Sequence, residues 1–143
     1  MSLSLSIQRN AQLCVATGQG AVTRKDIETY LARSVQEGAK GFAKLVDLTR
    51  CILALDGDDI EILADGLMLY GQGDQPGPVA LVVDTALNLD MAVLLKQRVG
   101  ARPFRIFTTA AAARFWLTSY REAAQPELFA PEMSAIPRPF RAL

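Results

Sequence analysis

Apolar and polar residues alternate at the start of the chain, where Leu3, Leu5 and Ile7 are separated by polar residues. This period of two predicts a half-buried strand. Residues 9–11 predict a turn, and residues 12–17 predict the antiparallel partner of the first strand. The chain is therefore expected to begin with a hairpin.

Apolar residues at helical spacing follow this hairpin. The first helix begins at Thr23-Arg-Lys-Asp26, a capping-box pattern in which the threonine side chain accepts a hydrogen bond from a free backbone amide. Glycines mark the ends of the first two helices. The four helices are predicted over residues 23–38, 56–71, 86–99 and 110–123.

Three further strands are predicted between these helices, at Lys44–Leu48, Val79–Val83 and Phe104–Phe107. Val79–Val83 is an unbroken apolar run, typical of a central parallel strand that is covered on both faces. The predicted order is β-β-α-β-α-β-α-β-α. This order indicates an α/β fold with a mostly parallel sheet, an antiparallel N-terminal edge strand and four helices.

One domain is expected over residues 1–124, because a chain of 143 residues suits one core. Residues 125–143 differ in composition: they hold four of the seven prolines and several large apolar residues, among them Phe129 and Phe140. We expect this tail to pack on its own domain or on a neighbouring subunit.

The charge and composition of the chain exclude several classes of function. The 15 basic residues equal the 15 acidic ones, so the excess of basic charge expected of a nucleic-acid binder is missing. The chain has no histidine, which excludes an imidazole base and nearly all zinc sites. Cys14 and Cys51 are expected to be buried free thiols of a cytoplasmic protein. No membrane span, metal or cofactor is expected.

Several segments of the chain resemble the SpoIIAA-like or STAS domain family, especially its small stand-alone bacterial members. The segments that carry the resemblance are Gly18–Arg24, Lys44–Thr49, Pro78–Val83, Phe104–Phe107 and the alanine-rich last helix. The resemblance implies a non-enzymatic regulatory or protein-interaction module. The family's phosphorylated serine begins the second helix, but the matching stretch here, residues 54–59, holds neither serine nor threonine. A module without serine phospho-switching is therefore implied.

The carboxyl ends of parallel strands meet at one rim of a sheet, where ligands commonly bind. Five residues of this chain follow strand ends and are candidates for a ligand rim: Asp47, Thr49, Asp84, Thr85 and Thr108. Aspartate and threonine are also the residues that turns and helix caps require. No nucleophile has an obvious base beside it, so no catalytic residue is predicted.

The third helix is predicted to place Leu87, Met91, Leu94 and Leu95 against the sheet. Leu89 and Val93 then point away from the sheet. Together with Phe129 and Phe140 they are the candidates for an interaction surface. Leu89 and Val93 are expected either to bind a protein partner or a second copy in a homodimer, or to be covered by the tail.

Two further expectations follow from the same helices. A carrier of a small apolar ligand or lipid is the alternative function, and it requires an apolar cavity lined from the second and third helices. In the last helix, Phe115, Trp116 and Tyr120 are expected in the core.

Overall fold

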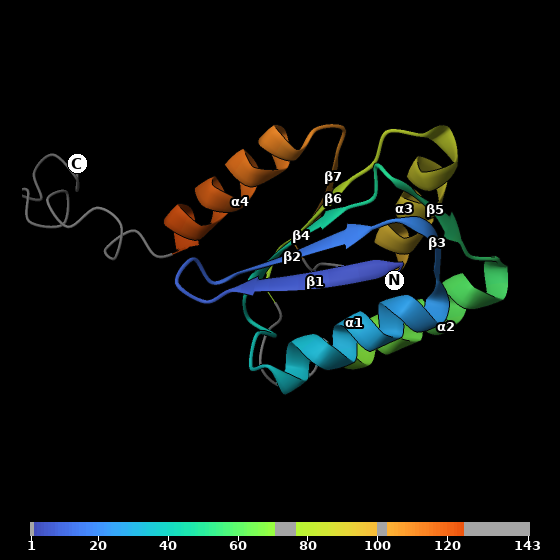
Figure 1. Cartoon of the computed structure of the whole chain (residues 1–143), viewed down its shortest axis with the longest axis horizontal. Helices are drawn as coiled ribbons and strands as arrows, with labels where there is room; N and C mark the ends of the chain where they lie inside the picture. The colour runs from blue at the N-terminus through green and yellow to red at the C-terminus, as the bar shows by residue number, and fades with distance from the viewer. Residues whose placement is uncertain (1, 71–76, 100–102, 125–143) are drawn as a thin grey trace, which may run out of the picture.

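The computed structural model describes residues 2–70, 77–99 and 103–124 (Figure 1). The strands are β1 Leu3–Gln8, β2 Leu13–Gly18, β3 Gly20–Thr23, β4 Ala43–Asp47, β5 Cys51–Ala54, β6 Val79–Val82 and β7 Phe104–Phe107. The helices are α1 Arg24–Gln36, α2 Gly57–Tyr70, α3 Ala86–Val99 and α4 Ala110–Ala124.

Five strands form the main sheet in the order β1-β2-β4-β6-β7. β1 pairs with β2 antiparallel, and every other pair in this sheet is parallel, which confirms the predicted fold class. The sequence did not predict β3 and β5, which form a separate two-stranded parallel sheet. β5 consists of four apolar residues and β3 has one polar residue in four, so neither shows an alternation of apolar and polar positions.

Helices cover both faces of the main sheet. Val79 and Leu81 of β6 belong to the core that α1 and α3 cover, whereas Ala80 and Val82 pack with Leu117 of α4. In Figure 1, α4 accordingly lies across the sheet from α1 and α2. Burial on both faces accounts for the unbroken apolar run in β6.

A buried lysine fixes the connection between α1 and β4. The Lys44 ammonium group donates hydrogen bonds to the backbone carbonyl oxygens of Ala39, Lys40 and Phe42 at 3.0, 2.6 and 2.7 Å. Gly77 lies against the same loop, since a Cβ atom there would come within 2.2 Å of the Phe42 carbonyl oxygen. Only glycine fits at this approach.

A buried asparagine fixes α3. The Asn88 side chain is 1% exposed, and its amide nitrogen donates to the carbonyl oxygens of Leu48 and Cys51 at 3.1 and 2.8 Å. Its amide oxygen accepts a hydrogen bond from the Leu53 backbone at 3.0 Å. One side chain thus joins α3 to the connection between β4 and β5 and to β5 itself.

The buried face of α3 differs from the prediction. Met91 and Leu95 pack on the core as expected. Leu87 and Leu94, which were also predicted to face the sheet, are 50% and 44% exposed. The reason is that Asn88 lies at the middle of the buried face of α3. The helix is therefore rotated so that these two leucines lie at the side of that face.

The last helix also departs from the prediction. Phe115 and Tyr120 are 76% and 36% exposed, so their placement in the core is wrong. Ala113 and Leu117 form the buried face, and Phe115 lies about 200° around the helix from Ala113. Trp116 is half-buried against Phe107, with ring centroids 5.8 Å apart.

Replacement of Asn88 by alanine is expected to lower the free energy of unfolding by about 3 kcal/mol, because three buried backbone groups lose their partner. Asn88→Asp is expected to cost at least as much, since its carboxylate would face the carbonyl oxygens of Leu48 and Cys51. Urea unfolding measures both values. Gln97→Ala, an exposed amide on the same helix, is the control and is expected to change stability by less than about 0.5 kcal/mol. An equal effect of the Asn88 and Gln97 variants would refute the role of Asn88.

Candidate functional site

A groove of about 550 Å³ lies between α3 and the outer side of β7. We call it the α3–β7 groove. Its lining residues are Val83, Asp84, Thr85, Ala86, Leu89, Val93, Lys96, Arg105, Ile106, Phe107 and Thr108. The groove therefore joins three rim candidates, Asp84, Thr85 and Thr108, to Leu89 and Val93, two of the exposed aliphatic residues of α3.

The groove follows the free edge of β7. Four consecutive residues, Arg105 to Thr108, line it. Because neighbouring residues of a strand point to opposite faces, a groove that contacts all four runs along the edge of the strand.

The backbone of β7 is unpaired on this side. Val79 and Val83 donate to the carbonyl oxygens of Pro103 and Phe107 at 3.0 and 2.9 Å, so these oxygens face β6. Alternate residues of a parallel strand direct their backbone groups to opposite neighbours. The N–H and C=O groups of Ile106 therefore point to the free edge, and none of the described residues bonds to them.

The middle of the α3–β7 groove is apolar. Leu89 and Val93 lie one turn apart on α3 and are 42% and 38% exposed. Ile106 of β7 packs partly against the core under the same helix and completes this wall. An aliphatic wall beside a free strand edge is suited to an extended polypeptide.

The two ends of the groove differ in charge. Lys96 and Arg105 line it together, and Lys96 follows Thr85 by about 16 Å along the axis of α3. Asp84 and Thr85 lie at the other end, where β6 leaves the sheet. Within the described ranges, Asp84, Lys96 and Arg105 have no ion-pair partner. The Arg105 guanidinium lies 5.2 Å from the ring centre of Phe107.

The remaining rim candidates form hydrogen bonds that stabilise a turn or cap a helix. The Asp47 carboxylate accepts hydrogen bonds from the backbone N–H and the hydroxyl of Thr49 at 2.9 and 2.7 Å. Neither residue lines the α3–β7 groove. The Thr85 hydroxyl accepts from the backbone N–H of Asn88 at 3.2 Å and so caps α3, although Thr85 also lines the groove.

Sequence reasoning missed Arg105, because a lone arginine in a four-residue strand carries no pattern of its own. The order of the strands supplies the missing information, since it makes β7 an edge. The candidates Phe129 and Phe140 lie outside the described residues.

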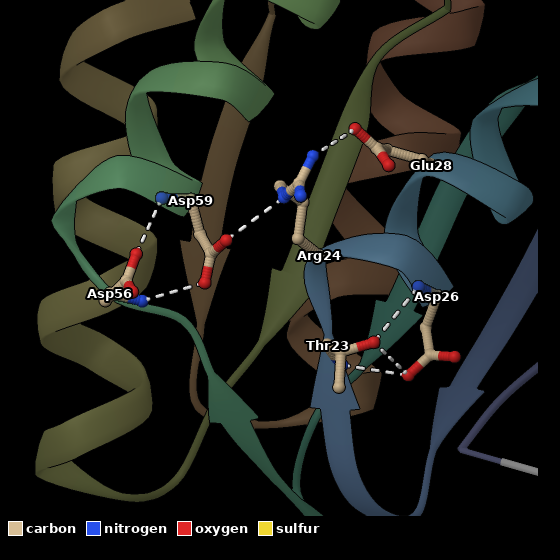
Figure 2. Close-up of polar contacts among 6 residues, drawn as sticks. All are labelled: Thr23, Arg24, Asp26, Glu28, Asp56 and Asp59. Carbon is tan, nitrogen blue, oxygen red and sulfur yellow. Dashed lines mark hydrogen bonds and ion pairs between the residues drawn. The ribbon is translucent and has the colours of Figure 1, made fainter.

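Figure 2 shows the start of α2, the stretch that the sequence resemblance matches to the family's phosphorylated serine. The Asp56 side chain accepts a hydrogen bond from the backbone N–H of Asp59 at 2.8 Å, and the Asp59 side chain accepts one from the backbone N–H of Asp56 at 3.1 Å. Arg24 of α1 donates to the Asp59 carboxylate at 3.0 Å and also pairs with Glu28. Asp56 and Asp59 thus cap α2 and join it to α1, while Asp58 is exposed and has no polar partner among the described side chains.

Thr23 and Asp26 form the capping box that the sequence predicts at the start of α1 (Figure 2). The backbone N–H of Asp26 donates to the Thr23 hydroxyl at 3.3 Å, and the backbone N–H of Thr23 donates to the Asp26 carboxylate at 2.8 Å. Both helices that meet at Arg24 therefore begin with reciprocal caps.

An apolar cavity of about 80 Å³ lies between the sheet and the helices α1, α2 and α3. Tyr30, Leu67 and Met91 are among its lining residues. The ligand sites of drug-sized molecules measure about 300–1,000 Å³. This cavity is therefore too small for a lipid as the side chains stand.

Neither cysteine is poised to react. Cys14 and Cys51 are free and buried, as the sequence predicts. Burial raises the pKa of Cys51 to about 11, and the nearby carboxylates of Asp47 and Asp84 add to the effect. Burial also raises the pKa of Cys14. Both groups are neutral thiols at pH 7, and the thiolate is the reactive form.

Among residues 2–70, 77–99 and 103–124, no three acidic or cysteine side chains gather as a metal would require. No helix in these ranges has the length and apolar character needed to cross a membrane.

A hairpin that leads into a parallel sheet, with helices on both faces, is the architecture of the SpoIIAA-like fold. No protein-family model and no curated protein matches the chain. The chain is similar to the crystal structure of an uncharacterized DUF3478-family protein with a SpoIIAA-like fold from Shewanella loihica PV-4. The match has a TM-score of 0.55 and 19% sequence identity, and covers 81% of this chain and 93% of that one. This likeness confirms the fold that the sequence resemblance implied.

The raised pKa of Cys51 predicts a dependence of stability on pH. Because the thiol of the unfolded chain ionises near pH 9 and that of the folded chain near pH 11, the folded state holds an extra proton between these values. The free energy of unfolding is expected to fall as the pH rises from 9 to 11. In urea titrations at pH 8, 9, 10 and 11, Cys51→Ala is expected to show a shallower fall than the parent chain. Identical slopes for the two chains would contradict the assignment.

Proposed function

We propose that this protein is a non-catalytic interaction module with a SpoIIAA-like fold, and that it binds a polypeptide segment in the α3–β7 groove. The observation that carries this proposal is the meeting of Leu89 and Val93 with the unpaired edge of β7 in one groove. Backbone hydrogen bonds to the edge would supply affinity, and the aliphatic wall would supply selectivity.

The chemistry of the groove supports binding over catalysis. Its ionisable side chains are Asp84, Lys96 and Arg105, and its hydroxyls are those of Thr85 and Thr108. The Thr85 hydroxyl is engaged as a helix cap, and the chain has no histidine to activate either hydroxyl. The Cys51 thiol is buried outside the groove.

A regulatory role without serine phosphorylation fits the start of α2. Asp56 and Asp59 carry the capping interactions there, and the stretch has no hydroxyl side chain to accept a phosphate. Regulation would then act through occupancy of the groove. Two buried free thiols agree with a cytoplasmic location.

The carrier alternative has weaker support. It relies on the apolar cavity under α1, α2 and α3, whose volume of about 80 Å³ is below the roughly 150 Å³ that holds a benzene molecule. The α3–β7 groove is several times larger but carries charges at both ends, which a lipid chain would leave unpaired.

Glutamate at both Leu89 and Val93 is expected to abolish binding, because two carboxylates would be buried by any segment that fills the groove. Native mass spectrometry of the untagged protein from its own cells measures the outcome. The parent chain is expected to carry a second polypeptide, either a copy of itself or a partner, and the double variant is expected to be bare.

Val35→Glu combined with Leu69→Glu is the matched control, since both side chains are exposed on helices away from the groove. This control is expected to keep the second polypeptide. A bare parent chain, or a Leu89 and Val93 variant that retains its companion, would refute the proposal.

A further inference from the structure

We infer that the segment bound in the α3–β7 groove is residues 132–138 of a second copy of this chain, added as a parallel strand on β7. This inference rests on the proposed function, because it names the occupant of the same groove. The inference compares the free strand edge and the charges of the groove with the sequence of residues 125–143. These residues lie outside the described part of the chain.

The free edge limits the length of the occupant. β7 has four residues, and the outward backbone groups of Phe104, Ile106 and Thr108 are spaced over about 13 Å. A strand of five to seven residues matches this edge and the groove beside it. Proline lacks a backbone N–H, so it is tolerated only near the ends of such a strand.

The charges of the groove favour one order of acidic, apolar and basic residues in a bound strand. A strand parallel to β7 passes Lys96 and Arg105 first and Asp84 last, since Asp84 lies beyond the carboxyl end of β6 beside Thr108. The matching strand has an acidic residue at its start, apolar residues in the middle and a basic residue at its end. An antiparallel strand requires the reverse order.

Residues 132–138 have the order that a parallel strand requires. Their sequence is Glu132-Met-Ser-Ala-Ile-Pro-Arg138, with an acidic start, a middle that is apolar except for Ser134, and a basic end. Pro131 and Pro137 leave five residues between them that can donate to a neighbouring strand. The charges at the two ends are about 20 Å apart in an extended chain, close to the 16 Å from Thr85 to Lys96 along α3.

The path of the chain favours a second copy over the same copy. α1, α2 and α3 connect successive parallel strands across one face of the sheet, whereas α4 covers the opposite face. A parallel strand added beyond β7 through α4 would reverse the hand of these crossovers, and nearly all crossovers share one hand. An antiparallel strand from the same copy would place Glu132 beside Asp84. A tail exchanged between two copies avoids both conflicts.

The experiment labels the tail of one copy and observes the groove of another. Full-length chain with a nitroxide on Ser134→Cys, at natural isotopic abundance, is mixed at pH 7 with full-length ¹⁵N-labelled chain. The native thiols are buried and neutral at this pH, so they stay unlabelled. The amide signals of Leu89, Val93 and Ile106 in the ¹⁵N chain are expected to broaden. A nitroxide on Val35→Cys is the control and is expected to leave these signals unchanged.

A charge exchange tests the assigned direction. Lys96→Glu and Glu132→Lys are each expected to raise the dissociation constant of the dimer about fivefold in sedimentation equilibrium. The combined variant is expected to return toward the parent value, because the pair is restored with its charges exchanged. A loss in the combined variant equal to the sum of the two single losses would refute the pairing of Glu132 with Lys96.

The outcomes distinguish a wrong occupant of the groove from a wrong function of the protein. Broadening that appears only when the nitroxide and the ¹⁵N label are on the same chain would overturn the exchange between copies. No broadening in either arrangement would overturn residues 132–138 as the occupant. If the Leu89 and Val93 glutamate variant still loses a bound polypeptide in these cases, the interaction function stands and a different segment fills the groove.

Discussion

The burial of one amide side chain sets the position of α3. Asn88 is placed among three backbone groups, one in the connection between β4 and β5 and two in β5 itself, and each of its polar atoms has a partner. A buried amide with unsatisfied groups costs more free energy than a shifted apolar contact, so hydrogen bonding decides which face of the helix is inside. Leu87 and Leu94 are displaced to the side of this face, while Leu89 and Val93 are directed toward β7. The α3–β7 groove thus depends on a residue that does not line it.

Much of the fold follows from patterns that a single sequence carries. The serine–leucine alternation of β1 and the capping box at Thr23 and Asp26 each depend on neighbouring residues only, so their elements are predicted correctly. β5 is missed because its four residues, Cys-Ile-Leu-Ala, contain no polar position and so no alternation. The face of α3 is misjudged because asparagine is ordinarily exposed, and only the tertiary structure reveals the three backbone partners of Asn88.

In the candidate site, too, some features follow from the local sequence and others depend on the tertiary structure. Asp84, Thr85 and Leu89 are found from the sequence, the first two as strand-end residues and the third as an outward aliphatic. Their convergence depends on how α3 crosses to β7, which no local pattern specifies. Asp47 resembles Asp84 in the sequence, yet its carboxylate is engaged by Thr49. The two aspartates follow similar strands but differ in their surroundings: Asp47 is hydrogen-bonded within a turn, whereas Asp84 lines the groove.

The two edges of the main sheet present different surfaces. β1 is the other unpaired edge; it alternates serine with leucine, and α1 packs against one of its faces. β7 presents Ile106 and the aliphatic wall of α3, with charges only at the two ends of the groove. Short edges form few backbone hydrogen bonds, and a four-residue strand by itself would capture extended chains weakly and without selection. In the proposed binding, the order of Lys96, the aliphatic wall and Asp84 along the groove would therefore supply the selectivity, because the backbone of β7 is the same for every sequence that pairs with it.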